Sequence, residues 1–153
     1  MIPTSPAIRH ETNVQLRPAA VADVDAVLAF WAAGAEGASV SDDPAGVSTL
    51  IASDPEALIL AVDGDAIVGT VIAGFDGWRC HLYRLAVAVD RCRKGIGGLL
   101  IAAAEERFEA LGGRRADAMV LELNAAAHGA WSASGFERED HWRRWVKPLP
   151  HEG

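Results

Sequence analysis

Residues 85–100 read LAVAVDRCRKGIGGLL and are the most informative part of the sequence. It begins with apolar residues typical of a buried β-strand, continues as a basic loop that contains glycine, and ends in an apolar run typical of a helix start. The first N–H groups of a helix have no partner inside the helix and lie at the positive end of its dipole. Because glycine also removes blocking side chains, the loop predicts a binding site for a phosphate or diphosphate group.

Two common phosphate-binding patterns do not fit the spacing of this loop. A Walker loop needs a lysine and then a serine or threonine after its last glycine, but Gly97 and Gly98 lead into Leu99. The dinucleotide fingerprint needs a third glycine where this chain has Leu100. Both alternatives are therefore disfavoured.

Apolar periodicity and turn residues predict the elements around the loop. The chain is expected to mix helices and strands without an internal repeat or a linker. The expected strands are 14–17, 57–62, 66–73, 81–89, 116–121 and a last β-segment at 142–146, and the expected helices are 19–34, a short one around 47–51, 97–111 and 124–134.

Length and composition predict one compact domain. The chain has 153 residues, of which 50% are hydrophobic, and this is too short for a second full domain. We expect the domain to span residues 14–149, with a tail at 1–13 and a short one at 150–153. The apolar run 26–35 is about half the ~20 residues that a spanning helix needs, so no membrane span is expected. The first residues lack a basic stretch followed by an apolar one, so a cytoplasmic protein is predicted.

Charge and residue content give no support for nucleic-acid binding, a disulfide framework or a metal site. The formal net charge of −7 gives no overall support for binding to nucleic acid. Cys80 and Cys92 are too few for a disulfide framework and are expected to be reduced. Asp63 and Asp65 flank a turn glycine without further ligands, so no metal site is predicted.

Two separated motifs identify a family resemblance. Gly95 and Gly97 match the diphosphate loop of the GCN5-related N-acetyltransferases, and Asn124, Ala127, Trp131 and the pair 135–136 match that family's late motif. The resemblance extends over about residues 14–149. It implies an α/β (α+β) fold with a mixed, mainly antiparallel sheet flanked by helices. Cys92 and Trp131 depart from the family pattern, because the family usually has glutamine or arginine at the first position and tyrosine at the second.

The resemblance also implies the chemistry. The expected activity is direct transfer of an acetyl group from acetyl-CoA to a primary amine of a small molecule, an amino acid or a peptide, within a ternary complex. The diphosphate would lie over the loop, and pantetheine would pair with the preceding strand, where a backbone N–H near Val87 would polarise the thioester carbonyl. The expected contacts are Leu85, Ala86, Val87, Arg93, Lys94, Gly95, Ile96, Gly97, Gly98, Asn124 and Trp131.

The acceptor side needs a group that takes a proton from an ammonium ion, whose pKa near ~10 lies above neutral pH. His81 and Tyr83 are two residues apart on a strand and therefore share a face. Both are candidate catalytic residues, although a surface histidine and a packed tyrosine are the alternatives. Trp131 is a third candidate, either as an aromatic wall beside the acetyl group or as part of the core.

Three hypotheses remain open at this point. The first is an acetyltransferase, the second a noncatalytic sensor or partner protein that binds CoA, and the third a nucleotide-binding protein. Trp78, Trp142 and Trp145 add a further choice, since each fits the core, an acceptor pocket or the contact of a homodimer.

Overall fold

The computed structural model describes residues 13–34, 42–92 and 94–150. The two predicted tails therefore lie outside the described residues, apart from Asn13 and Pro150, and so does Arg93. Within the described part of the chain, no helix is long and apolar enough to cross a lipid bilayer.

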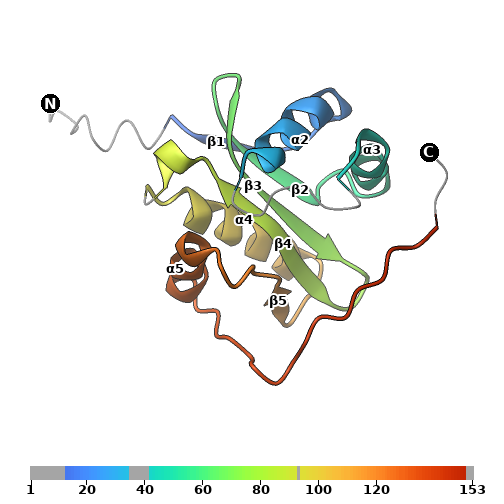
Figure 1. Ribbon diagram of the computed structural model, residues 1–153, viewed down its shortest axis with the longest axis vertical. Coiled ribbons are helices and arrows are strands. Elements are labelled where there is room, and N and C mark those ends of the chain that lie inside the picture. The colour runs from blue at the N-terminus through green and yellow to red at the C-terminus, as the bar shows by residue number, and fades with distance from the viewer. Residues whose placement is uncertain (1–12, 35–41, 93, 151–153) are drawn as a thin grey trace, which may run out of the picture.

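A five-stranded sheet forms the centre of the molecule (Figure 1). Its strands are β1 (Gln15–Pro18), β2 (Leu58–Asp63), β3 (Ala66–Phe75), β4 (Cys80–Val87) and β5 (Ala116–Ala118). They lie in the order β1-β2-β3-β4-β5, with antiparallel pairing from β1 to β4 and parallel pairing between β4 and β5. This arrangement confirms the predicted mixed, mainly antiparallel sheet.

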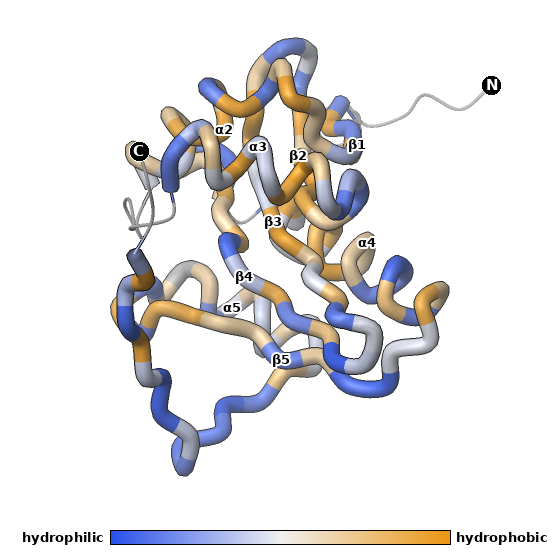
Figure 2. The backbone as a smooth tube through the Cα atoms, turned by 90° about the vertical axis from the view of Figure 1, so that its right-hand side faces the viewer, coloured by the Kyte–Doolittle hydropathy of each residue, from blue (hydrophilic) through white to orange (hydrophobic). Residues whose placement is uncertain are grey.

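Helices cover both faces of the sheet and create two cores. The short 3-10 helix η1 (Val21–Asp23), α2 (Val24–Ala32) and α3 (Pro44–Ser53) pack on one face, and α4 (Ile96–Ala110) and α5 (Ala125–Ala133) pack on the other (Figure 1). Strands β2 and β3 run between them as a largely hydrophobic stretch of chain (Figure 2). Their residues alternate between the two cores because side chains of a strand alternate between its faces.

Local signals in the sequence account for the ends of these elements. The side chain of Asp43 caps α3 by accepting the N–H of Gly46 at 2.6 Å, with Pro44 in the first helical turn. Gly64 turns β2 into β3 with φ of +61°, and Gly112 ends α4 with φ of +86°. Glycine adopts such angles without the steric cost that a β-carbon brings.

The prediction of a last β-segment at 142–146 is wrong. That part of the chain forms no regular strand and is exposed. Arg143 donates instead to the nearby carbonyls of Asp140 and Trp142, at 2.6 and 3.0 Å. An alternating pattern predicts a strand only where a neighbouring strand offers a ladder. Core packing of Trp78, Trp142 and Trp145 is also wrong, because all three side chains are exposed. An acceptor pocket and a homodimer contact stay predictions.

Gly113 gives a testable point of close packing between α4 and β4. A β-carbon at this position would collide with Sγ of Cys80 and lie 3.2 Å from the carbonyl of Phe108. We expect Gly113→Ala to lower the free energy of unfolding by about 1–3 kcal/mol, measured by urea denaturation. Gly129→Ala is the control, because Gly129 lies on α5 with open space around it and alanine favours helices. Equal stability of the Gly113→Ala variant and the wild type would contradict the packing.

Candidate active site

The N-terminus of α4 has the geometry of an anion site. After β4 the chain forms the 3-10 turn η2 (Val89–Arg91) and reaches Gly95, whose φ of +83° allows the entry into α4. The first bond of the helical ladder joins the N–H of Leu99 to the carbonyl of Gly95 at 3.1 Å. The N–H groups of residues 96–98 therefore precede the ladder, and Gly95, the N-cap residue, has no side chain with which to cap them. Such N–H groups and the helix dipole attract negative charge.

The space around the glycines fits a diphosphate. An ideal β-carbon at Gly95 or Gly98 would have no heavy atom within 4 Å, so both positions are open. Gly97 differs, because its β-carbon would lie 3.2 Å from the β-carbon of Ala130. Gly97 is buried and allows α4 to approach α5, whereas Lys94 next to the loop is exposed. The open cradle is therefore formed by the backbone and by Gly95 and Gly98.

Strands β4 and β5 pair over a short distance and then diverge. Their parallel register covers only residues 80–82 of β4, and the last bond joins the N–H of Met119 to the carbonyl of Leu82 at 2.8 Å. Strand β4 continues to Val87, while the segment that follows β5 leads away to α5. The N–H of Ala88 donates to Val68 on β3 at 2.9 Å. Because backbone direction alternates along a strand, the N–H of Val87 points to the diverging side.

A bulge interrupts β4 beside this gap. Thr70 pairs with Ala86 and Ile72 with Tyr83, so one residue of β3 lies opposite two residues of β4. Arg84 occupies the bulge with φ of +55°, and it is the one non-glycine among the described residues with a positive φ. The bulge reverses the alternation of side chains beyond Tyr83. The sequence pattern alone could not predict it.

His81 lies between two carboxylates near the start of β4. Its Nδ1 is 2.7 Å from Oδ1 of Asp117 on β5, and its Nε2 is 3.7 Å from Oδ2 of Asp76 in the β3–β4 turn. The backbone N–H groups of Arg79 and Trp78 hold the pKa of Asp76 below its ordinary value. The imidazole is 41% exposed and so remains in contact with solvent.

Tyr83 lies on the same face of β4 as His81, as predicted. It is 38% exposed, and burial of the rest of the ring raises the pKa of its phenol. The negative charge of Asp54 at the end of α3 adds to this increase in pKa. Tyr83 therefore keeps its proton to higher pH than a free tyrosine.

The late motif holds α5 in place. The side chain of Asn124 accepts the N–H of Ala127 at 3.3 Å and caps α5. Trp131 is 5% exposed and packs edge to face on Phe136, with 5.0 Å between the ring centroids. This burial matches the core alternative for Trp131, and its indole lies in the cluster between α4, α5 and the sheet.

A buried polar cluster beside the bulge escaped the sequence analysis. Nε1 of Trp31 donates to Oγ1 of Thr70 at 2.9 Å, and the Thr70 hydroxyl donates to the carbonyl of Arg84 at 2.8 Å. The Arg84 guanidinium lies over the Trp31 ring, 4.8 Å from its centroid, and forms an ion pair with Asp42. The periodicity around Trp31 predicts a buried helix face, but it carries no signal for these partners.

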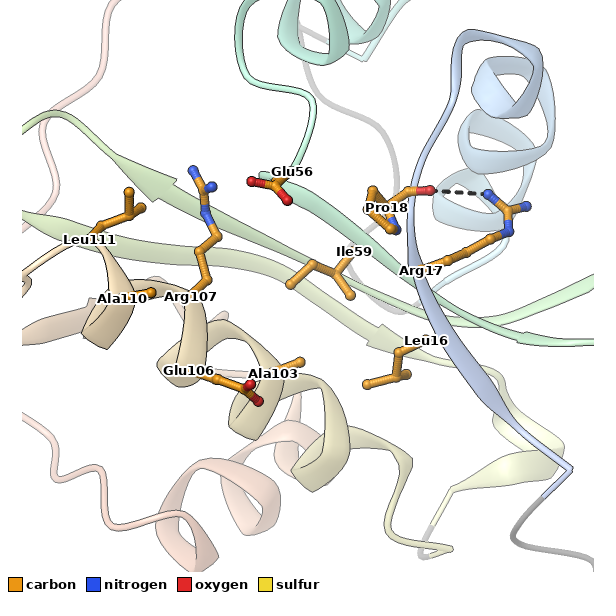
Figure 3. A pocket seen from close by; sticks show the side chains of 10 residues that line it. All are labelled: Leu16, Arg17, Pro18, Glu56, Ile59, Ala103, Glu106, Arg107, Ala110 and Leu111. Carbon is orange, nitrogen blue, oxygen red and sulfur yellow. Dashed lines mark hydrogen bonds between the residues drawn. The ribbon is translucent and has the colours of Figure 1, made fainter.

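A separate pocket of about 390 Å³ lies between β1, β2 and α4 (Figure 3). Ile59 and Leu16 form apolar walls, and Arg107 lies at one side, where it pairs with Asp54 at 2.6 Å and donates to the carbonyl of Ala73 at 3.1 Å. None of the predicted site residues lines this pocket. The candidate active site is therefore the gap between β4 and β5 together with the start of α4.

The described residues hold no group of three histidine, cysteine, aspartate or glutamate side chains that could bind a metal ion. Both cysteines are free. Burial raises the pKa of Cys80, and Sγ of Cys92 contacts the carbonyl of Ala88 at 3.5 Å.

Solved structures share this architecture. An aminoglycoside acetyltransferase from an uncultured soil metagenomic sample superposes with a TM-score of 0.72 at 17% identity, covering 91% of this chain and 98% of the other. The sheet that diverges between β4 and β5, with the glycine loop before α4, therefore has the fold of the acetyltransferases. The model of the acetyltransferase (GNAT) family matches residues 27–136, and the chain belongs to this family.

Two relatives give the extent of the similarity. An acetyltransferase of Yersinia enterocolitica is 36% identical over 87 residues, which cover 57% of this chain and 62% of the relative. This match thus spans less than two thirds of the relative's own length. An acetyltransferase of Pectobacterium atrosepticum is 30% identical over 118 residues, covering 77% of this chain and 84% of the relative. The predicted family resemblance is confirmed.

Proposed function

We propose that this protein transfers an acetyl group from acetyl-CoA to a primary amine of a small molecule, an amino acid or a peptide. The observation that carries the proposal is the start of α4, where three N–H groups precede the helical ladder beside open space at Gly95 and Gly98. Acetyl-CoA supplies a diphosphate for this cradle and a thioester for the transfer. Lys94 adds positive charge at the rim.

The edge of β4 that faces the gap is suited to the rest of the cosubstrate. The N–H of Val87 points to this side, and a pantetheine chain has amide groups that pair with such an edge. The N–H of Leu85 is next along the edge toward Tyr83. A backbone donor at this point polarises a thioester carbonyl and stabilises the oxyanion that forms as the amine attacks. Asn124 and Trp131 support the site by fixing α5 against α4.

We assign the role of general base to His81. In the neutral tautomer with a proton on Nδ1, the contact with Asp117 is a hydrogen bond, and Nε2, which lies 3.7 Å from Asp76, carries the lone pair. Nε2 then takes a proton from the acceptor ammonium through water. The tautomer is inferred from the short distance to the carboxylate.

We assign the role of general acid, which protonates the leaving sulfur, to Tyr83. The amine nitrogen forms a bond to the acetyl carbon, and the bond from that carbon to sulfur breaks. The ammonium loses two protons in all. The first passes to His81 before the attack and from there to solvent. The Tyr83 hydroxyl protonates the departing sulfur, and the second proton leaves the acetylated nitrogen through water and restores the hydroxyl. The raised pKa of Tyr83 keeps the hydroxyl proton available at neutral and mildly alkaline pH.

The variant Tyr83→Phe tests whether Tyr83 is the general acid. A thiolate is a fairly stable leaving group, since the pKa of an ordinary thiol is near ~8.5, so we expect kcat to fall only about tenfold. We also expect the alkaline decline of the rate, which deprotonation of the phenol causes, to disappear from the pH profile. A rate profile that is unaltered by Tyr83→Phe would remove Tyr83 from the mechanism.

A panel of amines tests the function as a whole. The assay follows release of CoA thiol from acetyl-CoA with amino acids, polyamines, aminoglycosides and peptides, with a reaction without amine as the control. The net charge of −7 favours cationic acceptors. Turnover with an amine in the panel supports the proposal. Tight binding of acetyl-CoA without turnover on any amine would favour a CoA-binding sensor, and stabilisation by ATP or NAD alone would favour a nucleotide-binding protein.

A further inference from the structure

The peptide group between Arg84 and Leu85 lies at the point where β4 leaves β5. Arg84 is the extra residue of the bulge, in a left-handed conformation that side chains with a β-carbon rarely adopt. Such a conformation persists only where the surroundings hold it. The contacts around Arg84 therefore show what holds this backbone conformation in place.

The hydroxyl of Thr70 fixes the direction of this peptide group. Thr70 is fully buried and accepts the indole N–H of Trp31 at 2.9 Å. Its own proton is directed to the carbonyl of Arg84 at 2.8 Å, on the β3 side of the strand. Because a trans peptide is planar, its C=O and N–H point in opposite directions. The N–H of Leu85 then points away from the Thr70 hydroxyl, toward the side of β4 from which β5 has diverged.

The side chain of Arg84 closes the same cluster from the other end. Its guanidinium lies over the ring of Trp31, which is 3% exposed, and pairs with Asp42 just before α3. Trp31 thus contacts the bulge twice, through the Thr70 hydroxyl and through the Arg84 side chain. The cluster thus connects α2 and the start of α3 to the backbone of β4, on the edge where the cosubstrate is proposed to bind.

We propose that Thr70 and Trp31 are positioning residues that aim the N–H of Leu85 at the thioester carbonyl. The inference rests on the proposed acetyl transfer and adds the side chains that orient the backbone donor. Neither side chain touches the acetyl group. Both act through the peptide group between Arg84 and Leu85. The orientation of this group affects the stability of the transition state more than the binding of acetyl-CoA, because the negative charge on the oxygen develops only in the transition state.

The test compares Thr70→Val with Thr70→Ser. Valine keeps the shape but removes the hydroxyl, and serine keeps the hydroxyl. We expect Thr70→Val to lower kcat about 10- to 100-fold with little change in the affinity for acetyl-CoA, and Thr70→Ser to retain most of the activity. Val27→Ala is the control for a general loss of stability in this core. Val27 is buried in the same cluster as Trp31 and makes no side-chain hydrogen bond.

The amide resonance of Leu85 gives a second measurement that does not depend on turnover. We expect acetyl-CoA to shift this resonance in the wild type and in Thr70→Ser, and to shift it much less in Thr70→Val. That pattern supports the inference even if no amine is acetylated, in which case only the proposed function fails. Equal kcat and equal shifts in Thr70→Val and the wild type would overturn the inference, and so would a wild-type Leu85 amide that does not respond to acetyl-CoA.

Discussion

Replacing Gly98 by glutamate is expected to weaken the binding of CoA by roughly 30-fold or more, as measured by calorimetry. Gly98 lies in the first turn of α4 with open space beside it, so the side chain fits and needs no movement of the backbone. Its carboxylate would occupy the positive end of the helix and repel a diphosphate. The estimate combines the loss of a helix-terminus interaction of about 2 kcal/mol with the relation between free energy and affinity.

Two controls separate the loss of binding from damage to the fold. Gly98→Gln adds the same volume without charge, and Ala102→Glu adds the same charge one turn later on an exposed part of α4. An acidic residue in the first turn stabilises a helix, so the melting temperature of Gly98→Glu should not fall. If Gly98→Glu and Ala102→Glu bind CoA equally well, the diphosphate does not lie at this helix terminus.

Replacing His81 by glutamine is expected to lower kcat about 100-fold, the usual effect of removing a general base. Glutamine keeps the polarity of the side chain but cannot accept a proton near neutral pH. Steady-state kinetics with saturating acetyl-CoA and amine measures the effect.

The neighbours of His81 provide matched variants. Asp117→Asn removes the charge that holds Nδ1 and should also reduce kcat, because the imidazole then loses its preferred tautomer. Asp76→Asn is the second variant and should reduce kcat less than Asp117→Asn, because Asp76 lies 3.7 Å from Nε2 and mainly accepts the N–H groups of residues 78 and 79. A His81→Gln variant as active as the wild type would assign His81 to the surface.

Local signals made much of the fold predictable. The apolar periodicity predicted the main helices and the first five strands, and Gly64 and Gly112 mark a turn and a helix end where glycine was expected. The loop before α4 was predictable for the same reason, because an unpaired helix start and a glycine are properties of neighbouring residues. These features depend on few long-range contacts.

The features that the sequence did not reveal depend on contacts between distant segments. Trp31 and Thr70 are 39 positions apart, and their hydrogen bond exists only because α2 packs over β3. The bulge at Arg84 follows from the register of β3 against β4, which periodicity does not encode. The contact of Gly97 with Ala130 on α5 is a third such feature, because the motif spacing does not tell which glycine contacts α5.

A crystal structure with bound CoA is the decisive measurement for the diphosphate site. We expect diphosphate oxygens within about 3 Å of the N–H groups of Ile96, Gly97 and Gly98, with pantetheine along the edge of β4 that faces away from β3. A diphosphate bound elsewhere, for example in the pocket beside Arg107, would rule out the site at the start of α4. So would a structure in which those N–H groups donate to the protein's own carbonyls while CoA is bound.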